Sequence, residues 1–331
     1  MFRSTGGPWR LTTLCGLMAA AALAGAAAPA ASAQVAVACA GSTTSTLAAI
    51  DAMVANNIYR GEMGGTETRT DLGHITTAPD LIAAVGADNV AETAKAVARI
   101  VYHHFWHIVR LRVYDAAGRL LADVGGPYVI APVDGVLRSV TGAQIGTFVM
   151  SVQDDVGFTK LESRALGNPI GIYVGGARVA QLGASFPKTE PSGASLTLGG
   201  VLYASETVTY DAFPSGTLDA VIAVPAPSAA LAAESCAAVD VSEIGRVAER
   251  LALRFHPLAA NYPNFVQVVN SETGAVVVVR IGERVIAASG GPGPITLPSH
   301  GTVSYEDRLW SVFTFAPTPP ARVYLLIAAP G

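Results

Sequence analysis

Three polar side chains suited to binding a carboxylate alternate along one predicted strand. Residues 108–114 read IVRLRVY, and successive side chains of a strand point to opposite faces of the sheet. Arg110, Arg112 and Tyr114 therefore share one face. A guanidinium group binds a carboxylate through two parallel hydrogen bonds, so this face is a candidate ligand site, with Trp106 as a wall. The alternative interpretation is an ordinary solvated sheet face.

Other residues with potential chemistry are sparse. His103 and His107 have the spacing of two zinc ligands on one helical face, but no third ligand is near in sequence. Residues 185–188 read SFPK, which has the spacing of an acyl-transfer SxxK motif, but Pro187 is incompatible with the helix that this motif needs. The sequence contains no GxSxG, HExxH or CxxC motif and no glycine-rich phosphate loop. We therefore expect no catalytic residue, no metal and no cofactor.

Apolar residues at helical spacing predict the helices that support this strand. A first helix carries Leu47, Ile50, Val54 and Ile58, a short one starts at Pro79, a third carries Val90, Ala94, Val97 and Val101, and a fourth carries Ile244, Val247, Leu251 and Phe255. Asp88 is the expected N-cap of the third helix. Arg246, Arg250 and Arg254 would lie on the outer face of the fourth, either as an anion site or as a solvated face.

The second half of the chain contains an internal repeat. Residues 158–183 align with residues 265–290 at an offset of 107, which superposes Phe158 on Phe265 and Gly167 on Gly274. Each copy reads as a short helix, a two-strand ribbon, a crossing rich in proline and glycine, and further strands. Asp154-Asp155 precedes the first of these helices and is expected to cap it, although the pair could also act as acid and base. The repeat indicates either a duplicated binding module or a duplicated scaffold.

The N-terminus predicts export. Arg3 and Arg10 precede an uncharged apolar run at residues 11–28, and an ASA cleavage site ends at Ala33. An uncleaved membrane anchor is the alternative. Cys39 and Cys236 would remain after cleavage and most simply form one disulfide, unless Cys39 is a lipid-acceptor cysteine. With a net charge of −4 and 14% charged residues, the chain has no basic stripe for nucleic acid.

The segment around the arginine strand resembles a known family. A turn with the pattern DxxGRLLA at residues 115–122 joins two strands, two more extended segments follow at residues 133–138 and 144–153, and a long helical pattern precedes them. This order resembles the Cache family of PAS-like extracytoplasmic sensor domains, over roughly residues 45–165. The resemblance implies helices on one sheet face and a ligand on the other. It also implies that Tyr128 and Asp154 complete the pocket, the aspartate taking an amine.

We therefore predict an α+β protein with a PAS/Cache-like antiparallel sheet, long N-terminal helices and a duplicated α+β half. The expected parts are a signal peptide (1–33), helices with the Cache-like module (34–167), a first repeat module (168–228) and a second (229–331). The expected function is non-catalytic binding of a small carboxylate or zwitterion outside the cytoplasm. A membrane-bound signalling protein is a candidate partner, nucleic acid is not, and no transmembrane segment is expected in the mature chain. A structural or adhesive surface protein and a hydrolase with an unrecognised site are the alternatives.

Overall fold

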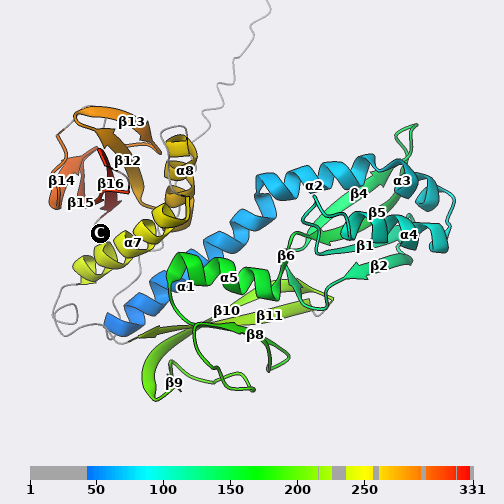
Figure 1. Cartoon of the computed structure of the whole chain (residues 1–331), viewed down its shortest axis with the longest axis horizontal. Coiled ribbons are helices and arrows are strands. Elements are labelled where there is room, and N and C mark those ends of the chain that lie inside the picture. The colour runs from blue at the N-terminus through cyan, green and yellow to red at the C-terminus, as the bar shows by residue number, and fades with distance from the viewer. Residues whose placement is uncertain are drawn as a thin grey trace, which may run out of the picture. The chain divides into compact units, whose positions relative to one another are not determined.

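The computed structural model describes residues 43–214, 216–225, 236–255, 261–291, 296–317 and 319–328. Within these residues the chain is an α+β protein built on three antiparallel sheets, as Figure 1 shows. The α+β class and the antiparallel pairing agree with the prediction from the sequence. Cys39 lies outside the described residues, and so does the side chain of Cys236, so the disulfide stays a prediction.

The first sheet has four strands, with helices on one face. Its order is β2-β1-β5-β4, formed by β1 (Arg110–Asp115), β2 (Leu120–Gly125), β4 (Val133–Arg138) and β5 (Gln144–Ser151). Helices α2 (Thr66–Thr77), α3 (Pro79–Gly86) and α4 (Val90–Val101) supply Ile75, Leu81 and Val97 to a core with Leu111 and Phe148 of the sheet. Figure 1 shows α3 and α4 beside these strands. The helices therefore cover the face that carries Leu111, and the opposite face is left to the arginines.

The start of α4 differs from the prediction. Asn89, not Asp88, caps the helix, and its side chain accepts a hydrogen bond from the backbone N–H of Glu92 at 3.1 Å. Asp88 instead has a positive φ of 53°, in the turn that follows α3. An aspartate tolerates this left-handed conformation better than most residues, which places the cap one residue later.

The second and third sheets contain the same strand order. The order in the second sheet is β9 (Ser195–Leu198), β10 (Val201–Phe213), β11 (Gly216–Pro225), β7 (Ile170–Val174) and β8 (Ala177–Leu182). Strand β10 also pairs with β3 (Val129–Ile130), which in turn pairs with β6 (Gln153–Asp154). In the third the order is β14 (Gly301–Tyr305), β15 (Arg308–Phe315), β16 (Ala321–Ala328), β12 (Val276–Ile281) and β13 (Arg284–Ala288).

The offset of 107 relates the helices that precede these sheets. It carries α5 (Asp155–Leu166) onto α8 (Tyr262–Thr273) with the same bounds. Both helices end at a left-handed glycine, Gly167 with φ 78° and Gly274 with φ 69°, a conformation that favours glycine after a helix. Asp154 caps α5, as expected, by accepting a hydrogen bond from the N–H of Gly157 at 2.6 Å.

One hydrophobic core joins the second and third sheets to the long helices. Helix α1 (Thr43–Gly64) buries Leu47, Ile50, Val54 and Ile58, which confirms its predicted apolar face. This core also contains residues of α5, α7 (Cys236–Phe255) and α8, together with strands of both sheets. Phe158 of α5 and Phe265 of α8 are fully buried in it, so equivalent residues of the two copies pack in the same core.

Candidate functional site

The two arginines of β1 share one carboxylate of the neighbouring strand. Arg112 lies directly opposite Asp123 of β2 in the sheet. Arg110 donates from Nε to Oδ1 of Asp123 at 2.8 Å and from Nη2 to Oδ2 at 2.7 Å, while Nε and Nη2 of Arg112 donate to Oδ2 at 3.0 and 2.6 Å. The side chains of Arg110, Asp123 and Arg112 are 11, 19 and 22% exposed. Two cations and one anion leave this partly exposed cluster with one positive charge.

The cluster keeps these groups charged. Burial raises the pKa of Asp123, but the hydrogen bonds and charges of Arg110 and Arg112 outweigh burial, so the pKa of Asp123 lies below its ordinary value. The hydrogen bond to Asp123 raises the pKa of Arg112, with a further contribution from Tyr114 beside it. The carboxylate therefore stays ionised between the two guanidinium groups near neutral pH.

A glycine corner and an aromatic ring hold Arg110 in place. Arg110 Nη1 also donates to the carbonyl of Gly126. Gly125 has a φ of 133°, and a Cβ there would lie 2.3 Å from the carbonyl oxygen of Val109, so only glycine fits. The guanidinium carbons of Arg110 and Arg112 lie 5.7 and 6.0 Å from the ring centroid of Phe213, which brings the end of β10 against the cluster.

The strand register extends this face across the sheet. Arg112 lies opposite Val149 of β5, and Val149 lies opposite Asp134 of β4, so the row reads cation, aliphatic side chain, anion. Directly opposite residues of neighbouring strands share a face, so all three belong to the arginine-bearing face. A pocket of about 320 Å³ is lined on this face by Asp134, Val136, Thr147 and Val149. Gly135 and Phe148 complete its lining, which includes neither arginine, so the pocket is linked to the arginine cluster through the row of Val149 and Asp134.

The structure brings some of the predicted site residues together and separates others. Tyr114 is on the same face as Arg110 and Arg112, two residues after Arg112 along the strand. Trp106 packs against the core on the opposite, helix-bearing face, where its ring stacks on His74 at 4.4 Å and on His103 at 4.2 Å between centroids. Trp106 therefore does not form a wall of the arginine-bearing face.

Tyr128 and Asp154 lie close to each other at the start of α5. The backbone N–H of Asp155 donates to the carbonyl of Tyr128 at 3.0 Å, and Asp154 pairs with Val129 across β3 and β6. The Asp154 carboxylate is already engaged by the N–H of Gly157. Its role in taking a ligand amine stays a prediction. Asp134, by contrast, is exposed on the arginine-bearing face.

Replacing Asp154 separates its two possible roles. If its carboxylate acts as a helix cap, Asp154→Ala should lower the free energy of unfolding by about 1 kcal/mol and leave ligand affinity unchanged. Asp154→Ser, which can still cap, should recover most of the stability. Denaturant unfolding and ligand titration of both variants measure this, and a loss of affinity without a loss of stability would contradict the capping role.

The histidines pair with neighbouring rings and with a carboxylate. His104 lies 5.5 Å from His103 between ring centroids, and His107 pairs with Glu67 of α2. Within the described ranges no group of three or more histidine, cysteine, aspartate or glutamate side chains is placed to hold a metal ion. The His103 and His107 pair therefore finds no third ligand there.

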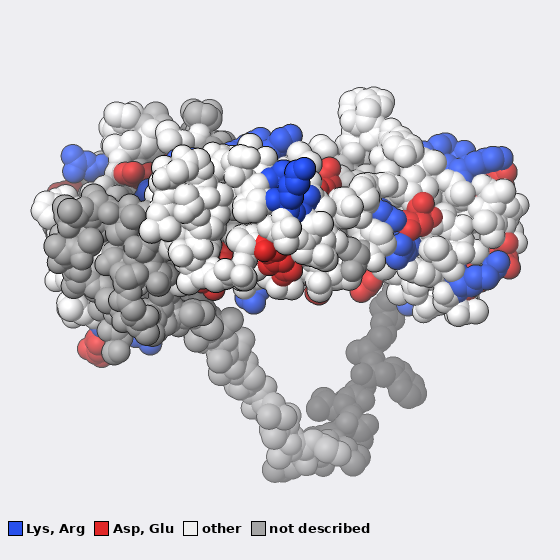
Figure 2. Space-filling view, turned by 90° about the horizontal axis from the view of Figure 1, so that it is seen from below, with Lys and Arg blue, Asp and Glu red and all other residues white. Residues whose placement is uncertain are grey.

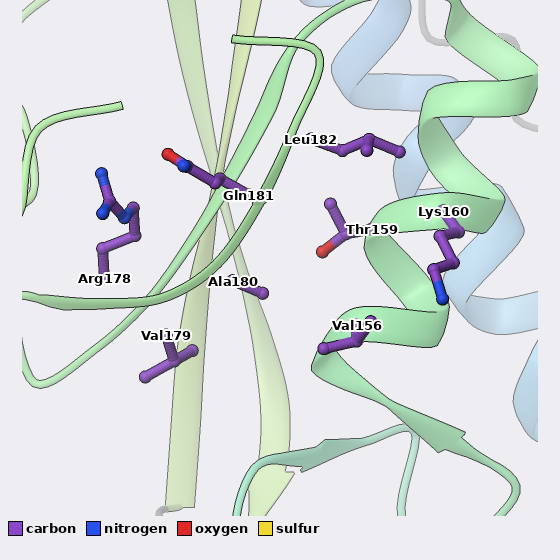
Figure 3. A pocket seen from close by; sticks show the side chains of 8 residues that line it. All are labelled: Val156, Thr159, Lys160, Arg178, Val179, Ala180, Gln181 and Leu182. Atoms are coloured by element: carbon purple, nitrogen blue, oxygen red, sulfur yellow. The ribbon is translucent and has the colours of Figure 1, made fainter. Parts of the chain in front are cut away.

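A second hollow lies between α5 and the edge strand β8. It has a volume of about 390 Å³ and is lined by Val156, Thr159, Lys160, Arg178, Val179, Ala180, Gln181 and Leu182. Figure 3 shows Arg178 and Gln181 directed away from α5, where both side chains bond the backbone of Phe186. Thr159 donates to a carbonyl of its own helix at 2.6 Å. The groove thus has a mixed lining, in which Thr159, Arg178 and Gln181 bond the protein's own backbone instead of converging on a ligand.

A buried polar network was not foreseen from the sequence. Arg246 of α7 donates to Glu243 and, from Nη2, to Oδ1 of Asp51 on α1 at 3.4 Å, and it also bonds the carbonyl of Leu166. Asn168 donates to the other oxygen of Asp51, whose side chain is fully buried. The prediction of an outer face for Arg246 is therefore wrong, because its charge is used between helices. Arg250, one turn on, is only partly exposed and donates to the carbonyl of Arg164 at 3.3 Å.

Surface charges of both signs are interspersed. Figure 2 shows basic and acidic side chains as small neighbouring groups on the face it draws. Several charged side chains form exposed ion pairs, including Arg99 with Asp80 and Lys95 with Glu92.

Comparison with known proteins assigns no family. No protein-family model matches the chain, and no curated protein matches it. In the part of the chain that the structure describes, no helix has the length and apolarity needed to span a membrane.

Proposed function

We propose that this protein is an exported, Cache-like, non-catalytic binding protein whose ligand is a small carboxylate or zwitterion. The observation that carries the proposal is the row Arg112, Val149 and Asp134 on the open face of the first sheet. Adjacent strands are about 4.8 Å apart, so the two charged residues are about 10 Å apart at the backbone. Their side chains can lean toward each other over Val149 and meet the two ends of one small zwitterion.

Charge and volume support a small ligand. The cluster of Arg110, Asp123 and Arg112 has one positive charge left, which favours an anion. Arg112 is the more exposed arginine, so we assign the ligand carboxylate to it and a supporting role to Arg110. A volume of about 320 Å³ lies at the lower end of the range of ligand sites, which suits a molecule of amino-acid size.

The layout of the sheets supports the Cache-like and duplicated parts of the proposal. Helices cover one face of the first sheet and the candidate site lies on the other, as the family resemblance implies. The second and third sheets have the same strand order after helices related by the offset of 107, which supports a duplicated half. Export, the signal peptide and a signalling partner remain part of this proposal.

A thermal-shift screen tests the proposed function. Amino acids, small carboxylates, amines and sugars are each added to the purified protein. At about 100 times its dissociation constant a ligand adds about 2.7 kcal/mol to the free energy of unfolding, so a carboxylate or amino acid should raise the melting temperature in a dose-dependent way. Stabilisation by sugars or amines alone would contradict the assignment to the arginine cluster.

A structural or adhesive role is the second candidate. Phe186 and Leu196 pack on one face of the second sheet, and Leu297 and Trp310 pack on one face of the third, each in a small apolar core. Filled faces of this kind favour a scaffold role for these two sheets. If no small molecule in the screen stabilises the protein, a structural or adhesive role is favoured for the whole protein.

A further inference from the structure

A carboxyl group is buried where α5 meets α1, α8 and β10. Glu162 of α5 is fully buried. The titratable groups that face it are Asp51 of α1, Glu272 of α8 and Tyr210 of β10. Tyr59 of α1 stacks on Tyr210 with 4.5 Å between ring centroids. Behind Asp51 lie Glu243 and Arg246 of α7.

Glu162 lacks the partners that normally accompany a buried charge. Among the described residues, neither of its carboxyl oxygens accepts a well-formed hydrogen bond, and the Tyr210 hydroxyl that faces it has no well-formed bond either. Its charged neighbours Glu272 and Asp51 are of the same sign. Burial first, and then these two carboxylates, raise the pKa of Glu162 well above its ordinary value and outweigh the nearby Tyr210 hydroxyl, which lowers it. An ionised Glu162 in this place is therefore strongly unfavourable.

The second copy of the repeat shows that packing alone does not require a carboxyl group here. The offset of 107 places Glu162 on Val269 of α8, which is also fully buried in the same core. An aliphatic side chain fills the equivalent position, and Phe158 and Phe265 occupy equivalent positions one turn earlier. A glutamate at this position costs stability whenever it ionises, so its presence needs another reason.

We propose that Glu162 is a proton-dependent latch between α5 and its neighbouring elements. Protonated, it is a neutral side chain that packs beside Tyr210 and stabilises the junction. Ionised, it repels Asp51 and Glu272 and loosens α5 from α1 and α8. The chain continues from Ser151 of β5, which pairs with Arg110, through β6 into α5 within four residues, so the helix that carries the latch is linked along the chain to the candidate ligand face.

The latch predicts an unusual direction of pH dependence. The unfolded chain releases the Glu162 proton near the ordinary glutamate pKa of about 4.3, whereas the folded protein holds it to a higher pH. Between these two values the folded state binds more protons at Glu162, so the contribution of Glu162 to stability falls as pH rises and is greatest in acid. Each pH unit in this window changes the unfolding equilibrium constant by up to about tenfold.

Denaturant unfolding of matched variants between pH 5 and 8.5 tests the latch. Glu162→Gln keeps the shape and removes the charge, Glu162→Val installs the residue of the second copy, and Glu206→Gln on β10 is an exposed control. The ratio of the wild-type unfolding constant to that of Glu162→Gln should rise with pH, by up to about tenfold per unit. The control should show a constant ratio. A constant ratio for both Glu162 variants would overturn the proposal.

A measurement on the wild-type protein keeps the test decisive if the variants fail to fold. The carboxyl carbon of Glu162, followed by NMR through the same pH range, should titrate well above the ordinary glutamate pKa. At the same time the backbone amides of α5 should exchange faster with solvent as pH passes this titration, beyond the intrinsic base-catalysed increase. Titration near 4.3, or α5 exchange that follows only the intrinsic rate, would overturn the latch.

Discussion

Replacing Arg246, whose side chain is 35% exposed, with leucine is expected to destabilise the protein by about 3 kcal/mol. This arginine is the cation of a network that contains Asp51 and Glu243, both buried acids. Removing one partner of a buried ion pair leaves the others uncompensated, and that cost exceeds the net contribution of the pair. Burial first and then Glu243 already raise the pKa of Asp51, and without Arg246 this carboxyl would be driven further toward its neutral form.

Arg250 provides the matched control for this prediction. It lies one turn further along α7, is partly exposed, and makes one long hydrogen bond to a carbonyl. Arg250→Leu should therefore change the free energy of unfolding by about 0.5 kcal/mol or less. Denaturant unfolding of both variants at pH 7 measures the difference. Equal effects of the two substitutions would mean that the network of Arg246, Asp51 and Glu243 does not hold the helices together.

Truncation of either equivalent phenylalanine is expected to have a similarly large effect. Phe158 and Phe265 are fully buried in one core, and Phe158 also contacts Tyr210 edge-on at 5.3 Å between ring centroids. A buried Phe→Ala substitution removes apolar contacts and leaves a cavity, at a cost of about 3–5 kcal/mol. Phe158→Ala and Phe265→Ala should each lower the free energy of unfolding by this amount.

Because the two phenylalanines share one core, both substitutions test whether the protein unfolds in a single transition. Phe105→Ala is the control, because this ring is 75% exposed and should contribute about 0.5 kcal/mol or less. Because both phenylalanines lie in the same core, circular dichroism and tryptophan fluorescence should report one coincident transition for each variant. Two separated transitions, with each substitution affecting only one, would show that the copies unfold independently.

Local patterns in the sequence were sufficient for the helices and for the faces of β1. The spacing of Leu47, Ile50, Val54 and Ile58 predicted the buried side of α1, and alternation placed Arg110 and Arg112 opposite Leu111. The offset of 107 pointed to equivalent turns, and Gly167 and Gly274 do adopt the same left-handed conformation. Such features depend on contacts within a few residues, which a single sequence records directly.

The partners of the arginines could not be predicted from local sequence patterns, because they depend on pairing between strands. Asp123 and Asp134 reach the arginine-bearing face only through the register of β2, β5 and β4. Phe213 arrives from β10, about a hundred residues later in the chain. Arg246 looked like part of a solvated row because its partner Asp51 lies on α1, far away in sequence. An acid within the apolar face of the first predicted helix was the one local sign of this network.

The side-chain Nε–H signals of the arginines give the most direct test of carboxylate binding. Glycine, glutamate, γ-aminobutyrate and acetate are titrated in turn into labelled protein, and Arg112→Gln assigns the Arg112 signal. This variant should remain folded, at a cost of about 1–2 kcal/mol, because Asp123 keeps Arg110. Arg119, an exposed arginine paired with Asp88 and Asp115, is the internal control.

The proposed function predicts that at least one of these carboxylates shifts the Arg112 and Arg110 signals saturably while the Arg119 signal stays in place. The same compound should lose its affinity for Arg112→Gln by at least about tenfold, which corresponds to about 1.4 kcal/mol. If no arginine signal moves at millimolar concentrations, or if Arg119 moves as much as Arg112, the arginine-bearing face is not a carboxylate site.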